Sequence, residues 1–304
     1  MNEYDVIIVG GGPAGLTCGL YLGRANVKVL LIEKLAPGGW IAITEHVDNY
    51  PGLVEPISGA ELASRIEKQA RKFGLQIQND EVLEIKIGIG EEMHEVRCHG
   101  SVYKCRFLVA ASGTFFKKLG VPGENKFFGR GVSICATCDA PLYRNKPIAV
   151  IGGGDSACQE ALYLARFASE VTIVHRRDKL RAVANLAQKA MNEPKIQFAW
   201  NSLPLEILGN TGVIGLRIRN KITGEESVLN VDGVFIYIGL EPNLSFAKDI
   251  FKCDEYGFII ANERMLTNVP RIYAIGDVRS TVLRQVVTAC ADGAVAAQSI
   301  SEDL

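Results

Sequence analysis

Gly10-Gly11-Gly12-Pro13-Ala14-Gly15 lies between a short apolar run, Tyr4–Val9, and a segment of helical pattern that extends to about Arg24. A second apolar run, 27–32, ends in Glu33, close to the spacing of ~20 residues expected for an acid that binds a ribose. The order strand, glycine-rich turn, helix, strand and acid is typical of a dinucleotide-binding unit. Its glycines let the backbone approach a pyrophosphate, whose charge the helix N-terminus attracts. The sequence therefore predicts nucleotide binding at this turn.

The same pattern recurs at residues 152–176, where Gly152-Gly153-Gly154 repeats the three glycines and Ala157 replaces the last one. In place of the acid stands His175, followed by Arg176 and Arg177, with Arg181 one turn further on. Guanidinium groups bind a 2′-phosphate through charge-assisted hydrogen bonds, whereas a carboxylate repels it. We therefore expect a cofactor with a free 2′-OH at the first turn and NADPH at the second. The alternative for the basic cluster is a solvated charged patch.

Ser133-Ile134-Cys135-Ala136-Thr137-Cys138-Asp139 lies just before the second turn. Two cysteines at this spacing, beside a strand–turn–helix pattern, indicate redox chemistry. The carboxylate directly after the second cysteine is a candidate general acid or base. The alternatives are a static disulfide or half of a zinc site, but zinc needs a second pair of ligands. Cys98 and Cys105 are close in sequence, yet no second Cys-x-x-Cys exists.

The composition fits a globular chain of roughly two domains, with 304 residues of which 48% are hydrophobic. A net charge of −1 gives no reason to expect nucleic acid or membrane binding. The N-terminus lacks the basic start of a secretion signal, and the uncharged run Val6–Gly23 holds six glycines, which favours strand, turn and helix over a membrane span. We therefore expect a cytoplasmic protein, in which a persistent disulfide is catalytic. The remaining cysteines are expected to be buried small hydrophobes: Cys18, Cys98, Cys105, Cys158, Cys253 and Cys290.

The remaining segments predict further elements of the same α/β pattern. We expect ligand-contacting loops at 37–40 and 48–52, a helix at 61–73, an antiparallel add-on sheet within 76–108, strands at 107–111, 234–238 and 271–275, a hairpin of 217–222 with 227–231, and a closing helix from 284 to 298.

Taken together, the motifs resemble those of the low-molecular-weight, bacterial-type thioredoxin reductases, which are NADPH- and FAD-dependent pyridine nucleotide-disulfide oxidoreductases. The resemblance covers essentially the whole chain. It rests on Gly10 to Gly15, Asn49-Tyr50-Pro51-Gly52, Cys135 to Asp139, Gly152 to Ala157, His175-Arg176-Arg177 with Arg181, Gly276-Asp277 and Arg284-Gln285.

The resemblance implies an α/β fold with two Rossmann-like, three-layer ββα domains, the NADPH domain being inserted into a discontinuous FAD domain. The implied boundaries are 1–115 and 245–304 for the FAD domain and 116–244 for the NADPH domain with its Cys-x-x-Cys. It further implies a homodimer that reduces thioredoxin. The NADPH domain would rotate between half-reactions on hinges at 114–118 and 241–245.

Site residues follow from the same resemblance. Cys138 would face the flavin, Cys135 would attack the substrate disulfide, Asp139 would be their acid or base, and Asp277 would bond the flavin ribitol. The implied FAD-binding residues are Gly10, Gly12, Pro13, Ala14, Gly15, Glu33, Lys34, Gly38, Gly39, Trp40, Asn49, Ala111, Ser112, Gly113, Gly276, Asp277, Arg284, Gln285 and Val286. The implied NADPH-binding residues are Gly152, Gly154, Asp155, Ser156, Ala157, His175, Arg176, Arg177 and Arg181. Trp40 and Ser112 depart from the family, which usually has Gln and Thr there.

Other functions remain open at this point. The electron acceptor could be a peroxiredoxin-system or glutaredoxin-like protein instead of thioredoxin. The chain could also be a non-catalytic NADP(H)-binding redox sensor, although a sensor needs only one nucleotide site. A ferredoxin–NADP reductase of similar fold has no use for the dithiol.

Overall fold

The computed structural model describes residues 2–44, 47, 49–247 and 249–304. Asp48, part of the predicted loop at 48–52, lies outside the described residues. The chain divides into two compact units, which are described separately. Unit 1 comprises Met1–Phe115 and Glu241–Leu304, and unit 2 comprises Phe116–Leu240.

Unit 1 is built on one sheet of order β3-β2-β1-β6-β5-β4, with β17 paired to β6 off this path. The pairs β1–β2, β1–β6, β2–β3 and β6–β17 are parallel, and β4–β5 and β5–β6 are antiparallel. The strands are β1 (Asn2–Val9), β2 (Val29–Glu33), β3 (Gln76–Asn79), β4 (Val82–Lys86), β5 (His94–Cys98), β6 (Val102–Ala110) and β17 (Ile272–Ala274).

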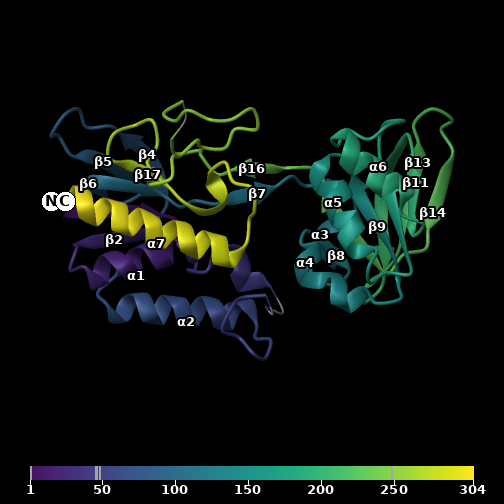
Figure 1. Cartoon of the computed structure of the whole chain (residues 1–304), viewed down its shortest axis with the longest axis horizontal. Helices are drawn as coiled ribbons and strands as arrows, with labels where there is room; N and C mark the ends of the chain where they lie inside the picture. The colour runs from purple at the N-terminus through teal and green to yellow at the C-terminus, as the bar shows by residue number, and fades with distance from the viewer. Residues whose placement is uncertain (1, 45–46, 48, 248) are drawn as a thin grey trace. The chain divides into compact units, whose positions relative to one another are not determined.

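Three helices cover one face of this sheet (Figure 1): α1 (Pro13–Arg24), α2 (Gly59–Lys72) and α7 (Val286–Asp303). Side chains alternate across a strand, so Val6 and Ile8 of β1 pack with the helices while Ile7 and Val9 pack on the other face. There they meet residues of β4 and β5 such as Ile85. The unit is therefore layered as helices, parallel sheet and antiparallel strands.

One detail of the sequence prediction for unit 1 is wrong. The segment 76–108 was expected to form an antiparallel add-on sheet, but β3 pairs in parallel with β2. It does so because α2 returns the chain over the sheet, which places the following strand in the crossover direction of a βαβ unit. Only β4 and β5, with β6, form the antiparallel part.

Unit 2 repeats this layering. Its parallel sheet has the order β11-β10-β9-β15-β8 and a separate antiparallel sheet has the order β12-β13-β14. Ile148 and Val150 pack against α5, while Ala149 and Ile151 pack toward the antiparallel sheet. The elements are β8 (Val132–Ser133), β9 (Pro147–Gly152), α5 (Asp155–Leu164), β10 (Glu170–Val174), α6 (Ala184–Asn192), β11 (Ile196–Ala199), β12 (Ser202–Gly209), β13 (Val213–Asn220), β14 (Glu226–Leu229) and β15 (Gly233–Tyr237).

The chain passes between the units twice, and the two crossings, β7 (Thr114–Phe116) and β16 (Leu240–Pro242), pair with each other in a two-stranded sheet. All four apolar clusters lie within single units, two in each. The short elements are η1 (Gly39–Ile43), α3 (Glu124–Phe127), α4 (Ala136–Asp139), η2 (Ala140–Tyr143) and η3 (Gly276–Val278). No helix among the described residues is both long and apolar enough to cross a membrane.

Candidate active site

The first glycine-rich turn connects β1 to α1 at the carboxyl edge of the parallel sheet. A Cβ on Gly10, whose φ is +109°, would lie 2.4 Å from the Ala111 carbonyl oxygen, and one on Gly15 would lie 2.1 Å from the Gly10 carbonyl oxygen. Packing of the protein therefore requires both glycines. A Cβ on Gly12 would meet nothing within 4 Å. Since its φ of −72° suits any residue, the absence of a side chain at Gly12 leaves room for a ligand.

Glu33 ends β2 directly beside this turn. Its carboxylate accepts the Gly11 N–H at 2.6 Å and the Leu35 N–H at 2.9 Å. These two bonds fix the carboxylate at the place where a nucleotide ribose would lie above the turn. Lys34, by contrast, pairs with Glu81 at 2.8 Å on the surface.

Loop residues 38–40 are held against the same turn. Gly38 N donates to the Gly11 carbonyl oxygen at 2.7 Å, and a Cβ on Gly39 would lie 3.3 Å from Gly12 Cα. Asn49 Nδ2 donates to Gln285 Oε1 at 3.2 Å, which joins the following loop to the start of α7. The structure thus brings together predicted site residues from three separate segments of unit 1.

The C-terminal segment completes this group. Gly276 is so close to α1 that a Cβ on it would lie 2.9 Å from that of Ala14. Burial raises the pKa of the neighbouring Asp277 carboxyl, with Arg284 acting in the opposite direction. Gln285 caps α7 in a reciprocal box with Thr288, and Val286 is the first residue of the helix. The positive end of the α7 dipole is therefore at Gln285, a site that favours developing negative charge.

The two family departures make contacts near the crossings. Trp40 Nε1 donates to the Thr114 carbonyl oxygen at 2.7 Å, and Ser112 Oγ donates to the Asn243 carbonyl oxygen at 2.6 Å. Asn243 N returns a bond to the Gly113 carbonyl oxygen at 3.0 Å. A Cβ on Gly113 would meet nothing within 4 Å, so this position also leaves space.

The second glycine-rich turn, between β9 and α5, has the same open position. A Cβ on Gly154 would have only Arg181 Nη2 near it, at 3.7 Å. Arg181 N donates to the Gly153 carbonyl oxygen at 2.6 Å, and Val183 N donates to Asp155 Oδ1 at 2.8 Å. These bonds hold a guanidinium beside the turn, where a phosphate could bind it. Ser156 is exposed and Ala157 is buried in the first turn of α5.

His175 lies where Glu33 lies in the first turn, but it is buried, and burial lowers the pKa of its imidazole. A Cβ on Gly153 would lie 2.2 Å from His175 Nδ1, so the ring packs directly under the turn. Arg176, Arg177 and Arg181 are exposed, and no ion pair among the described residues involves them. Their charges are available to an anionic ligand.

The dithiol is a disulfide between Cys135 and Cys138, which are half-buried and 5.3 Å apart between Cα atoms. Cys135 precedes the single turn of α4, which ends at Asp139. The buried Ser133 Oγ donates to Asp139 Oδ2 at 2.5 Å and accepts the Cys135 N–H at 3.1 Å. From β15, the Tyr237 hydroxyl accepts the Ala136 N–H at 2.7 Å. The sequence prediction missed both hydroxyls. Ser133 had a signal, since serine often accepts an N–H two residues onward.

The six other cysteines are free. Cys18, Cys98, Cys105 and Cys158 are buried as expected, and burial raises the pKa of each thiol, that of Cys158 to about 11. Cys253 and Cys290 are free as well, but only partly buried. Within the part of the chain that the structure describes, no three His, Cys, Asp or Glu side chains gather in a way that could hold a metal ion.

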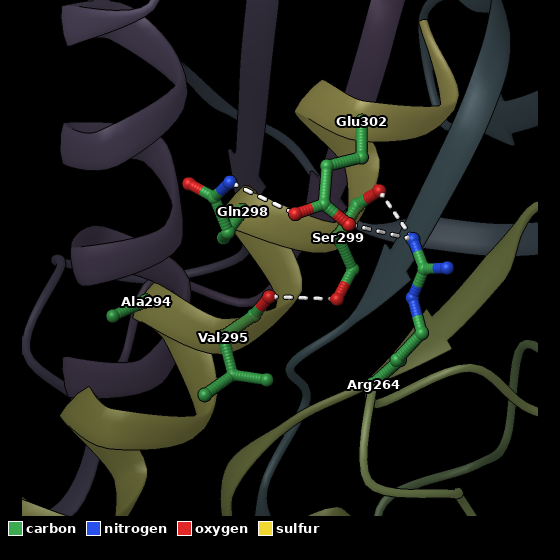
Figure 2. Close-up of a pocket in the computed structure, with 6 residues that line it drawn as sticks. All are labelled: Arg264, Ala294, Val295, Gln298, Ser299 and Glu302. Carbon is green, nitrogen blue, oxygen red and sulfur yellow. Dashed lines mark hydrogen bonds and ion pairs between the residues drawn. The ribbon is translucent and has the colours of Figure 1, made fainter.

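A surface pocket on unit 1 lies apart from these groups (Figure 2). Its Arg264 bonds to Glu302 at 3.2 Å, as Figure 2 shows. Arg264 also bonds to Asp303 at 3.1 Å. The lining contains none of the predicted site residues and consists of Arg264, Ala294, Val295, Gln298, Ser299 and Glu302. We therefore do not place the active site there.

Comparisons with known proteins agree with this geometry. The family model described as "Pyridine nucleotide-disulphide oxidoreductase" matches residues 4–293. The chain is 47% identical over 298 residues to the thioredoxin reductase of Bacillus subtilis, covering 98% of this chain and 93% of the relative. It is 44% identical to that of Listeria monocytogenes, covering 97% and 92%. The crystal structure of the Streptococcus pyogenes thioredoxin reductase matches with a TM-score of 0.91 and 42% identity, covering 99% of this chain and 97% of that one. The α/β fold class predicted from the sequence is confirmed, and the chain belongs to the pyridine nucleotide-disulphide oxidoreductases and, within them, to the thioredoxin reductases.

Proposed function

We propose that this protein is an NADPH-dependent thioredoxin-disulfide reductase in which the Cys135–Cys138 pair passes electrons to oxidised thioredoxin. The observation that carries the proposal is the disulfide of α4, which lies in the same unit as the arginine-lined turn while a second, acid-lined turn occupies unit 1. Family membership supports the use of both FAD and NADPH. A sensor with one nucleotide site has no need of this arrangement.

We assign FAD to the turn of unit 1 and NADPH to the turn of unit 2. Glu33 would accept a hydrogen bond from a ribose hydroxyl of FAD, and the open Gly12 would let its pyrophosphate approach the backbone. In unit 2, Arg181 with Arg176 and Arg177 would bind the 2′-phosphate of NADPH. When bound, the two cofactors supply a hydride and pass its electron pair to a disulfide.

The chain's own residues carry the second half of the reaction. Two electrons and two protons convert the Cys135–Cys138 disulfide to a dithiol. The Cys135 thiolate then attacks one sulfur of the thioredoxin disulfide, which forms a mixed disulfide and releases a thiolate on thioredoxin. Cys138 displaces the reduced thioredoxin and restores the internal disulfide. Asp139, which follows Cys138 directly, would hold the proton that leaves or returns to the thiols.

Three further proposals follow from the resemblance. Unit 2 would rotate between half-reactions about the crossings β7 and β16, which is supported by the presence of a separate core in each unit. The enzyme would be a homodimer, which light scattering tests as a particle of twice the chain mass. It would act in the cytoplasm, where a reducing pool keeps thioredoxin in use.

The first experiment is an anaerobic titration of the flavin-loaded enzyme with NADPH, followed by addition of thioredoxin. Since flavin and dithiol each store two electrons, the wild type should take up two equivalents per subunit and be reoxidised by thioredoxin. Cys138→Ser should take up one equivalent and reduce no thioredoxin. Cys253→Ser, which removes a partly buried thiol outside the site, is the matched control. An uptake that Cys138→Ser leaves unchanged would refute the proposed function.

A further inference from the structure

Ser133 is a polar residue in an otherwise apolar strand, β8, and its side chain is buried with 5% exposure. Its hydroxyl oxygen lies 2.5 Å from Asp139 Oδ2, 3.1 Å from Cys135 N and 3.4 Å from the Cys135 carbonyl oxygen. It therefore contacts both ends of the segment that carries the disulfide.

The direction of these bonds follows from counting protons. A serine hydroxyl has one proton to donate and two lone pairs that accept. The Cys135 N–H can only donate, so it occupies a lone pair. The single proton has two possible acceptors, and the carboxylate oxygen is the nearer one, at 2.5 Å against 3.4 Å. Hydrogen bonds to ionised acceptors are shorter and stronger than neutral ones, so the proton points to Asp139.

We propose that Ser133 is the positioning residue that aims the Asp139 carboxylate at the Cys135–Cys138 pair and favours its ionised form. The inference rests on the proposed function, because it assigns Ser133 a part in the proton transfer of Asp139. The hydrogen bonds of Ser133 Oγ go to Asp139 and to the backbone of Cys135, and we expect Ser133 to act on the sulfur atoms through Asp139.

Ionisable side chains also come from β15 and from α5, the helix that packs against α4. Tyr237, in β15, is uncharged, because burial raises the pKa of its phenol well above the usual value. From α5, burial raises the pKa of Glu160 and that of the Cys158 thiol. Tyr237 is bonded to Ala136 N, at the opposite end of the turn from the carboxylate. Ser133 Oγ donates directly to the carboxylate of Asp139, at 2.5 Å.

The test is Ser133→Ala, measured by stopped flow in the step from dithiol to thioredoxin and in the earlier step from NADPH. A hydroxyl that donates to a carboxylate favours its charged form, so its loss should shift the acidic limb of the pH–rate profile upward by about one pH unit. We expect the thioredoxin step at neutral pH to slow by about tenfold, a fraction of what a general acid or base contributes. Reduction of the flavin by NADPH, which moves no thiol proton, should keep its rate.

Two variants separate positioning from a merely structural effect. Ser133→Thr keeps the hydroxyl and should restore the wild-type limb. Ser299→Ala removes a hydroxyl that is equally buried, with 5% exposure, and bonds only back to Val295 O in α7. It should leave the profile unchanged. If Ser133→Ala and Ser299→Ala give the same pH profile, the proposal is overturned.

A double-mutant cycle with Asp139→Asn decides whether Ser133 works through the carboxylate or through Cys135 N. If it works through the carboxylate, Ser133→Ala should add less than about a twofold loss in the Asp139→Asn background. A loss as large as in the wild type would assign Ser133 to Cys135 and overturn the proposal. A wild-type enzyme that fails to reduce thioredoxin would instead refute the proposed function, so the two failures are distinguishable.

Discussion

The two glycine-rich turns have the same backbone plan but opposite chemistry at one position. In both, the second glycine packs against a residue at the carboxyl end of the next strand, which is Glu33, the last residue of β2, in unit 1 and His175, directly after β10, in unit 2. The Glu33 carboxylate accepts the Gly11 N–H. His175, by contrast, is buried beneath Gly153, and the exposed residues that follow it are Arg176 and Arg177. Under the proposed cofactor assignment, the two turns differ in cofactor preference because of the residue at the end of the second strand.

The two turns also differ in the space around the last residue of the glycine motif. In unit 1 a Cβ at Gly15 would lie 2.1 Å from a backbone oxygen, while unit 2 already holds the Cβ of Ala157 at the matching position. We expect Gly15→Ala to lower the free energy of unfolding by about 3 kcal/mol through overpacking. Denaturant unfolding measures the loss, and flavin absorbance should show that the cofactor is lost as well.

Gly12→Ala is the matched control for this variant. Its Cβ would meet no protein atom within 4 Å, so the protein should unfold at nearly the wild-type denaturant concentration. It should nevertheless lose flavin, because the Cβ occupies the space left for the pyrophosphate. Full flavin content in Gly12→Ala would contradict the assignment of that space.

Acid should weaken unit 1 through His94, a fully buried histidine on β5 whose pKa burial lowers to about 4 from the usual 6.5. The folded state disfavours the charged imidazole of His94. The free energy of unfolding is therefore undiminished by this group above pH 6.5 and decreases as the pH falls toward 4. The loss should reach about 3 kcal/mol. Unfolding midpoints across this range should flatten in His94→Leu and keep their slope in His99→Gln, an exposed histidine.

The arginines of unit 2 offer a test of cofactor preference. Arg181→Ala should raise the KM for NADPH by about tenfold to a hundredfold, since a charge-assisted bond to phosphate is lost. The kcat should stay the same, and so should the KM for NADH, which lacks the 2′-phosphate. Arg166→Ala, which removes an exposed arginine two residues after the end of α5, should change neither constant. Equal effects on NADPH and NADH would refute the assignment.

The smallest effect is expected for Ala157→Gly, which makes the second turn resemble the first. Glycine in the first turn of α5 should cost about 1 kcal/mol relative to alanine. The KM for NADPH should not change, because Ala157 is buried beside Gly152 and is not among the atoms near the open position of Gly154. Thermal unfolding measures the loss of stability, and steady-state kinetics measure the KM. A large change in the KM would show that packing at residue 157 affects the binding of NADPH.

The sequence predicted what local spacing determines. The glycines, Glu33, His175 and the Cys135–Cys138 pair lie in patterns of fixed length, so strand, turn and helix followed directly. The parallel pairing of β3 was missed because alternation in a strand is the same for both directions of pairing. Tyr237 was missed because its bond to Ala136 joins residues far apart in sequence, and no local pattern encodes such a contact.

The pairing of β7 with β16 has a consequence for protein engineering. Because the chain leaves and re-enters unit 1 at adjacent positions, residues 116–240 begin and end side by side and enclose their own apolar clusters. We therefore expect residues 116–240 to fold when they are expressed alone, and to be tolerated as an insertion in a surface loop of another protein, because their two ends lie close together.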